Sequence, residues 1–194
     1  MSDGGARVVV QEVAVFPMPG VVLLPEQRLP LHIFEPRYRA MVRDTLEGSA
    51  HLAVACVVGD ASADPPRFAE VATVGRIVAH QRLPDGRFNV LVEGLLRARL
   101  DELPFAPPYR RARVTPLGDP ARESVEVRPA LRLALLNVMS QVIRNARAGK
   151  GRFDFEPPTG LPSGRLAWRL VDRFVTAPTW RQRVLEAGDP TARV

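Results

Sequence analysis

The stretch LPDGRFNVLVEGLLRARL, residues 83–100, decides the fold of half the chain. From Phe88 to Leu100 every even-numbered residue is apolar or glycine, and most odd-numbered residues are polar. Because successive side chains of a β-strand point to opposite faces, this alternation predicts a strand with one buried face. The strand is far longer than the usual ~5–6 residues, so it must coil or bend, and Gly94 is where it can do so.

The segment 71–83 is the expected hairpin partner of this strand. Leu83-Pro84-Asp85-Gly86 lies between them and has proline and glycine where a tight turn uses them. A type I turn with a glycine bulge pairs Leu83 with Arg87. Continued in step, this register places Gly75 opposite Leu95 and Arg76 opposite Gly94, so that two glycines nearly face each other where both strands bend.

The other segments before residue 120 predict short strands and one helix. The strands are expected at residues 13–16, 28–34, 51–58 and 109–117. The helix is expected at 36–46, with proline in its first turn and a buried face made by Tyr38, Met41, Val42 and Leu46. Many short strands and a single helix favour a partly closed, mostly antiparallel β-barrel over a parallel α/β sheet.

After Pro120 the hydrophobic period becomes helical. Apolar residues at three-four spacing predict a helix over 131–146, a second beginning at Ser163 as N-cap, and a short third with Thr179 as N-cap. We therefore divide the chain into a β-barrel domain, 1–119, and a C-terminal helical subdomain, 120–194. The predicted fold class is α+β: a coiled, mostly antiparallel β-barrel with one inserted helix, followed by a small helical bundle.

Composition excludes several kinds of chemistry. With 46% hydrophobic and 25% charged residues, the 194-residue chain can bury a normal core, which excludes wholesale disorder. One cysteine, Cys56, excludes an internal disulfide or a multi-cysteine zinc site, and the three histidines share no helical spacing. We therefore expect no metal and no cofactor. The net charge of +6 arises entirely after residue 120, since the residues before it are balanced.

No segment predicts export or membrane insertion. The first apolar run, 8–10, is interrupted by Gln11 and Glu12, whereas a signal peptide needs a longer unbroken apolar stretch. No stretch approaches the ~20 apolar residues of a transmembrane helix. We expect a cytoplasmic protein without membrane contacts.

The chain resembles the N-terminal domain of Lon proteases, known as the Lon substrate-binding domain. The resemblance is carried by VFPMPGVVLLP at 15–25, LPLHIFEPRY at 29–38, VGRI at 74–77, LPDGRFNV at 83–90 and VEG at 92–94, and residues 165–194 are similar to that domain's helical bundle. The resemblance covers nearly the whole chain. It implies a PUA-like coiled β-barrel followed by a helical subdomain.

The catalytic motifs of a full Lon protease are not found in this sequence. A phosphate-binding loop needs Gly-Lys-Ser/Thr, because its backbone amides and lysine neutralise phosphate charge. The single lysine, Lys150, is followed by Gly151, and nothing around it matches a Ser-Lys protease motif. The sequence thus predicts a stand-alone Lon-domain protein that is not an enzyme.

Two groups of residues are candidates for a binding site. The first lies in the proline-containing apolar run at 15–25, where apolar and polar residues do not alternate as they do in a half-buried strand. Its candidates for an exposed groove are Phe16, Met18, Val22 and Leu24. An adaptable, methionine-containing apolar patch suits the binding of varied unfolded segments. The alternative, that the run is one more buried strand, stays equally open. The second group lies where a strand meets the helix: Phe34, Glu35, Arg37 and Tyr38.

A structural role is favoured over a functional one for the charged residues of the second group and for the other candidates considered. Glu35 and Arg37 are more simply a helix-end charge and a structural brace, with Glu93 and Arg97 as candidate partners in such a brace. Cys56 is expected to be a buried, inert thiol, and His32 a surface or hydrogen-bonded histidine. Trp168 and Trp180 are expected to lie in a helical core, with the neighbouring arginines on the solvated face.

The leading functional hypothesis is a non-catalytic module that binds exposed apolar polypeptide segments or docks on a protein partner, through burial of apolar side chains in a groove. The alternative is nucleic-acid binding by a PUA-like barrel joined to basic C-terminal helices. The two differ in salt dependence, because phosphate contacts release counterions.

Overall fold

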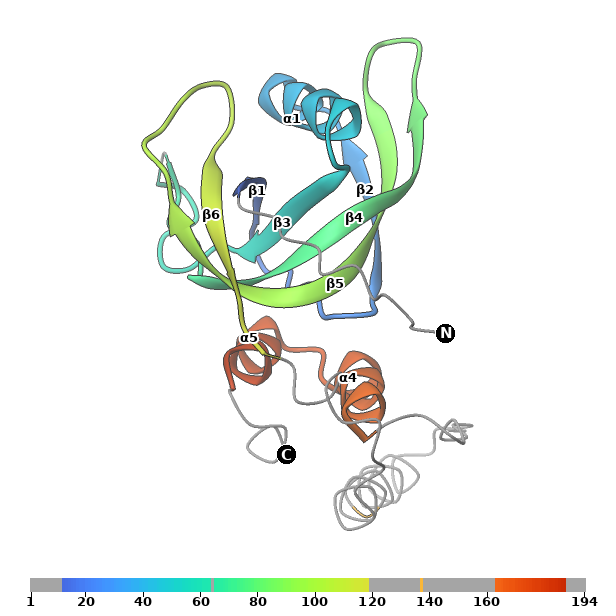
Figure 1. The fold of residues 1–194 in the computed structure, drawn as a ribbon, viewed down its shortest axis with the longest axis vertical. Coiled ribbons are helices and arrows are strands. Elements are labelled where there is room, and N and C mark those ends of the chain that lie inside the picture. Colours follow the sequence, from blue (N-terminus) through green and yellow to red (C-terminus); the bar gives the residue numbers. More distant parts are fainter. Residues whose placement is uncertain (1–11, 64, 119–136, 138–162, 188–194) are drawn as a thin grey trace, which may run out of the picture. The chain divides into compact units, whose positions relative to one another are not determined.

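The computed structural model describes residues 12–63, 65–118, 137 and 163–187. Contacts divide the chain into two compact units, Met1–Leu117 and Gly118–Val194. The described part of the first unit holds strands β1 to β6 and helix α1, and that of the second holds helices α4 and α5 (Figure 1). The helix predicted over 131–146 lies outside the described residues, apart from the helical Asn137.

The six strands form one coiled sheet in the order β2-β5-β4-β3-β1-β6. β1 and β3 are parallel and every other pairing is antiparallel. β6 pairs with β1 and also with the C-terminal end of β5, so the sheet coils back toward itself (Figure 1). The strands are β1 (Glu12–Met18), β2 (Arg28–Ile33), β3 (His51–Cys56), β4 (Val71–Arg82), β5 (Phe88–Glu102) and β6 (Arg111–Pro116). This confirms the predicted α+β class with one inserted helix, as a coiled sheet and not a closed barrel.

The β4–β5 hairpin follows the predicted register at both of its ends but not in the middle. The Leu83 amide donates to the Arg87 carbonyl across the turn (2.8 Å), as the turn sequence predicts. Two register shifts, between Val74 and Gly75 and between Ile77 and Ala79, lie farther along the ladder. Gly75 therefore pairs with Gly94, and the predicted pairing of Gly75 with Leu95 was wrong.

The loop that precedes β2 crosses β5 at Gly94, within this irregular part of the hairpin. The Glu26 amide donates to the Gly94 carbonyl (2.8 Å), and the Gly94 amide donates to the Gln27 carbonyl (2.9 Å). A side chain at position 94 would overlap the Leu24 carbonyl oxygen, so only glycine allows the loop to approach this closely. The glycine at 94 thus serves a backbone crossing as well as a bend.

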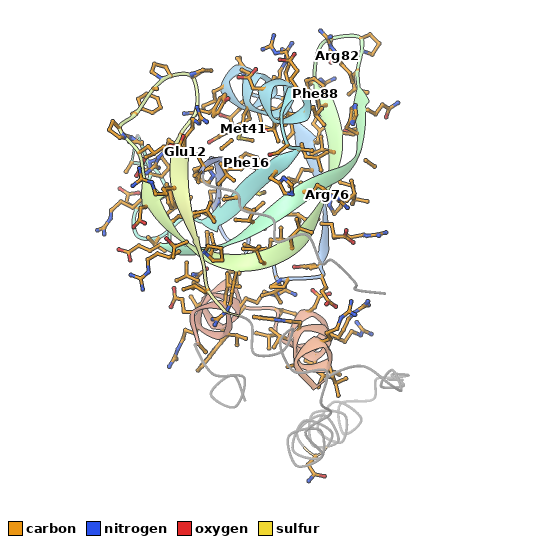
Figure 2. All side chains as sticks on the ribbon, viewed as in Figure 1. Glu12, Phe16, Met41, Arg76, Arg82 and Phe88 are labelled. Carbon is orange, nitrogen blue, oxygen red and sulfur yellow. The ribbon has the colours of Figure 1, made fainter. Side chains whose placement is uncertain are left out.

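Helix α1 (Pro36–Glu47) covers one of two core clusters of the first unit. Met41 and Val42 are fully buried, and Tyr38 and Leu46 pack partly buried against the same cluster, as predicted. Phe16 and Met41 belong to this cluster and lie near each other between α1 and the strands (Figure 2). A second cluster takes the alternate residues of β1, Val13 and Val15, so β1 is buried on both faces.

In the second unit, α4 (Ser163–Phe174) buries Leu166, Leu170 and Val171, and Trp168 is only 2% exposed. The burial of Trp168 confirms the prediction that it lies in a helical core. Helix α5 (Pro178–Glu186) begins after Ala177, so Thr179 is not its N-cap and that prediction was wrong.

Trp180 is also not a core residue, because 56% of it is exposed and the Arg183 guanidinium stacks 4.5 Å from its ring. On a helix, five residues rotate the side chain by roughly 140°, so Trp180 points away from the buried Leu185.

Candidate functional site

The first unit contains a pocket of about 340 Å³ between the start of α1, strand β1 and two loops. α1 and the β5–β6 loop lie at the same end of the sheet (Figure 1). Most of the lining is aromatic or proline, and the charged residues are two arginines and one glutamate. The lining residues are Val15, Pro17, Arg37, Tyr38, Pro65, Pro66, Glu102, Phe105, Pro108, Tyr109 and Arg110. Concave, mostly apolar sites with a few polar groups are typical of ligand pockets.

Two of the three aromatic rings are held in place by contacts outside the pocket. The Tyr38 ring packs edge-on against Phe16, with ring centroids 4.5 Å apart. The Tyr109 hydroxyl donates a hydrogen bond to the Asp44 carboxylate on α1 (2.8 Å). Burial, and then this hydrogen bond, raise the pKa of Tyr109, so its hydroxyl stays protonated as a donor. Phe105, in contrast, is 64% exposed and offers an apolar face to a ligand.

Arg110 holds the two loops of the pocket together. Its Nε and Nη2 donate to the two oxygens of Glu102 (2.5 and 2.6 Å), and its Nη1 donates to the Pro66 carbonyl. The guanidinium also lies 4.3 Å from the centroid of the Phe68 ring. A bidentate arginine–carboxylate pair of this kind fixes geometry. Only 12% of the Arg110 side chain is exposed, so its role is to position the walls.

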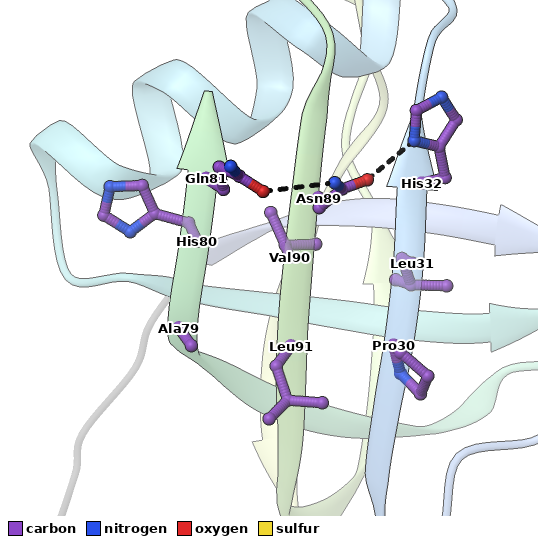
Figure 3. A pocket seen from close by; sticks show the side chains of 9 residues that line it. All are labelled: Pro30, Leu31, His32, Ala79, His80, Gln81, Asn89, Val90 and Leu91. Carbon is purple, nitrogen blue, oxygen red and sulfur yellow. Dashed lines mark hydrogen bonds between the residues drawn. The ribbon is translucent and has the colours of Figure 1, made fainter. Parts of the chain in front are cut away.

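A second, shallower hollow of about 520 Å³ lies over β2, β5 and β4 (Figure 3). Across it runs a row of polar side chains from three strands. His32 Nδ1 lies 2.7 Å from Asn89 Oδ1, and Asn89 Nδ2 donates to Gln81 Oε1 (3.5 Å). These groups hydrogen-bond to one another, and the paired residues Pro30, Leu91 and Ala79, two positions farther along the three strands, are apolar. The polar side chains of this row thus bond to one another across the surface of the sheet. We therefore take the first pocket as the candidate site.

The apolar run proposed from the sequence as an exposed groove is mostly core. Phe16, Val22 and Leu24 are buried, and Met18 is partly buried against the first core cluster. Of the two interpretations that the sequence left open, burial is therefore the one that holds for Phe16, Val22 and Leu24, and these three are corrected as candidates for an exposed groove. The alternation is lost because β1 is buried on both faces and the residues after it continue into the interior. Phe16 contributes to the pocket only by supporting Tyr38.

Of the four residues singled out at the strand–helix junction, two line the candidate pocket and two line neither hollow. Arg37 and Tyr38 line the candidate pocket. Phe34 does not line it: the Phe34 ring is 61% exposed and stacks on His32 with centroids 6.3 Å apart. Glu35 is the N-cap residue of α1 and makes no side-chain cap, and its carboxylate accepts a hydrogen bond from Arg37 Nε (3.0 Å).

Three further expectations have clear outcomes. Glu93 pairs with Arg28 (3.2 Å). Arg97, whose place in the alternation predicts an outward, solvated side chain, is only 3% exposed, so that prediction of exposure was wrong. Cys56 is buried as predicted, and desolvation raises the pKa of its thiol. His32 is an exposed, hydrogen-bonded histidine, also as predicted.

Most of the pocket was missed from the sequence. Phe105, Pro108 and Tyr109 come from the β5–β6 loop, and Pro65 and Pro66 come from the loop between β3 and β4. Residues 109–117 were assigned to a strand, which begins only at Arg111. The sequence did hold a signal for this loop: in LPFAPPY, 103–109, Phe105 lies between prolines. Prolines favour a loop, and an aromatic side chain on a loop is less easily buried in the core.

A family model for the substrate-binding domain of ATP-dependent protease La (Lon) matches residues 12–194. The chain belongs to the Lon substrate-binding domain family. The Lon protease of Trichlorobacter lovleyi is 30% identical over 187 residues, which is 93% of this chain and 22% of that protein. Lon protease 2 of Sorangium cellulosum is 30% identical over 193 residues, 94% of this chain and 23% of that protein. The chain thus spans less than a quarter of the length of these relatives.

Solved structures of Lon N-terminal domains have the same fold. The Lon N-terminal domain protein from Xanthomonas campestris superposes with a TM-score of 0.70 at 22% identity, covering 95% of each chain. The N-terminal domain of Mycobacterium avium complex Lon protease gives 0.65 at 18% identity, covering 94% of each. The family match is to the substrate-binding domain of Lon. In the part of this Lon-family chain that the structure describes, no helix has the length and apolar character to span a bilayer.

Proposed function

We propose that this Lon-family domain binds exposed apolar segments of polypeptides in the pocket formed by Tyr38, Phe105 and Tyr109. The observation that carries the proposal is Phe105, a large apolar side chain left 64% exposed at the edge of a concave, mostly apolar pocket. The description of the matched family as a substrate-binding domain supports a binding role.

The pocket is suited to binding and not to bond cleavage. Two of its polar side chains already have structural partners: Arg110 is held by Glu102, and the Tyr109 hydroxyl donates to Asp44. Apolar burial is then the main source of affinity. Micromolar binding needs about 8 kcal/mol, and apolar burial supplies ~25 cal/mol per Å² before the costs of association.

Replacement of Phe105 by alanine is expected to weaken binding of an unfolded polypeptide about tenfold. Truncation of an aromatic side chain that anchors a ligand costs on the order of 1–2 kcal/mol. Because Phe105 is mostly exposed, the variant should keep the stability of the wild type. Fluorescence anisotropy of a labelled unfolded protein, such as reduced casein, measures the change.

Phe34→Ala is the matched control, since Phe34 is a comparably exposed phenylalanine of the same unit that does not line the pocket. It should bind like the wild type. Equal binding by both variants and the wild type would place the polypeptide site elsewhere.

A second candidate function is nucleic-acid binding by the basic second unit, and the exposed Trp180 beside Arg183 is the observation that favours it. Aromatic rings next to arginines can stack on unpaired bases. If so, binding of a labelled single-stranded oligonucleotide should fall steeply between 50 and 200 mM salt, and Trp180→Ala should weaken it several-fold. Weak binding that Trp180→Ala leaves unchanged would remove this candidate.

A further inference from the structure

The walls of the candidate pocket offer a ligand few main-chain donors. Four of its lining residues are prolines, at positions 17, 65, 66 and 108, and proline has no backbone N–H. The pocket is therefore poorly suited to a ligand that depends on main-chain hydrogen bonds to the protein.

Strand addition at β1 is blocked for the same reason. β1 pairs with β3 along one edge, through Ala14–Met18, and with β6 along the other, through Glu12–Ala14. Just past that second pairing, the Val15 amide donates to the Arg110 carbonyl (2.8 Å). Alternate residues of a strand direct their amides to the same edge, so the next donor would be residue 17, which is proline. An added strand would find no N–H there.

The side chains of the pocket, in contrast, form a preorganised aromatic surface. Tyr38 is held by Phe16 and Tyr109 by Asp44, so neither ring has to be ordered when a ligand arrives. Aromatic-lined grooves bind polyproline II segments, whose backbone makes no internal hydrogen bonds and stays solvated. Arg37 stands at the pocket with 51% of its side chain exposed, and its guanidinium can donate to a ligand carbonyl.

We infer that the pocket selects proline-containing segments in the polyproline II conformation, in preference to apolar segments that bind as β-strands. This inference rests on the proposed function, since it names the class of polypeptide segment that the same site takes. A stiff, preformed ligand also suits the site because it loses little conformational entropy when it binds.

The test is a titration of the full chain with two labelled ten-residue peptides, one of proline only and one of alternating leucine and serine. We expect the proline peptide to bind at least tenfold more tightly. Phe105→Ala should weaken its binding about tenfold, and Phe34→Ala should leave it unchanged. Equal binding of the two peptides, or proline binding that Phe105→Ala does not weaken, would overturn the inference.

The result also separates this inference from the proposed function. If the leucine–serine peptide and unfolded casein bind, and Phe105→Ala weakens both while the proline peptide does not bind, the site is a general apolar pocket and only the polyproline preference is wrong. If neither peptide nor casein binds, both the preference and the proposed function fail.

Discussion

Replacement of Val22 by aspartate is expected to unfold much of the first unit, with a loss of about 3–5 kcal/mol in the free energy of unfolding. Val22 is only 4% exposed, and its neighbours in sequence, Leu23 and Leu24, are at most 1% exposed. A carboxylate placed there loses most of its hydration, and the burial of a charge is among the most destabilising of single changes. Since small domains have about 5–15 kcal/mol of stability, this loss is a large share of the total. Urea denaturation followed by far-UV circular dichroism measures it.

Val21→Asp is the matched control, because the same change then falls on a partly exposed side chain one residue earlier. It should cost less than about 1 kcal/mol. The comparison also tests the groove proposed from the sequence. If Val22→Asp were as stable as the wild type and had lost only polypeptide binding, Val22 would belong to a binding surface and the packing described for residues 22–24 would be wrong.

Local patterns predicted much of this fold. The alternation over 88–100 and the Pro-Asp-Gly turn are properties of neighbouring residues, and they identified β5, its hairpin with β4, and the phase of the buried face. The helix at 36–47 was predicted to within one residue, because Pro36 marks its first turn and Met41 and Val42 mark its buried face. In each case the deciding interaction lies within a few residues in sequence.

The failures involve contacts between distant segments. Arg97 has the phase of an outward residue, but the structure leaves it only 3% exposed. Trp180 lies on a helix of nine residues, which has few buried positions, and two of them are taken by Gln182 and Leu185. The pocket joins a loop near residue 65 to one near residue 105, and no pattern in either loop specifies the other. Of the pocket residues, only Arg37 and Tyr38 on α1 were named as candidate site residues from the sequence, because they belong to the run LPLHIFEPRY where a strand meets the helix.

Gly94→Ala is expected to destabilise the first unit by about 3–5 kcal/mol, although it adds a single methyl group. The new carbon would overlap the Leu24 carbonyl oxygen and lie 3.1 Å from the carbonyl carbon of Leu24. Backbone cannot rotate aside as a side chain can, so the crossing loop must move away from β5. That movement would break the two hydrogen bonds between Gly94 and residues 26 and 27, each worth about 1 kcal/mol, in addition to an overpacking cost of about 1–3 kcal/mol.

Gly59→Ala provides the informative contrast. Gly59 has a positive φ of 74° and open space around it, so alanine there bears only a backbone penalty of roughly 1–2 kcal/mol. Gly94 has no such φ, and its whole cost comes from the overlap with the loop. The glycine in the rarer conformation should therefore be the easier one to replace, which urea denaturation of the two variants can decide. If Gly94→Ala unfolds at the same or a higher urea concentration than Gly59→Ala, the loop can withdraw from β5 at little cost, and the crossing does not determine the register of the hairpin.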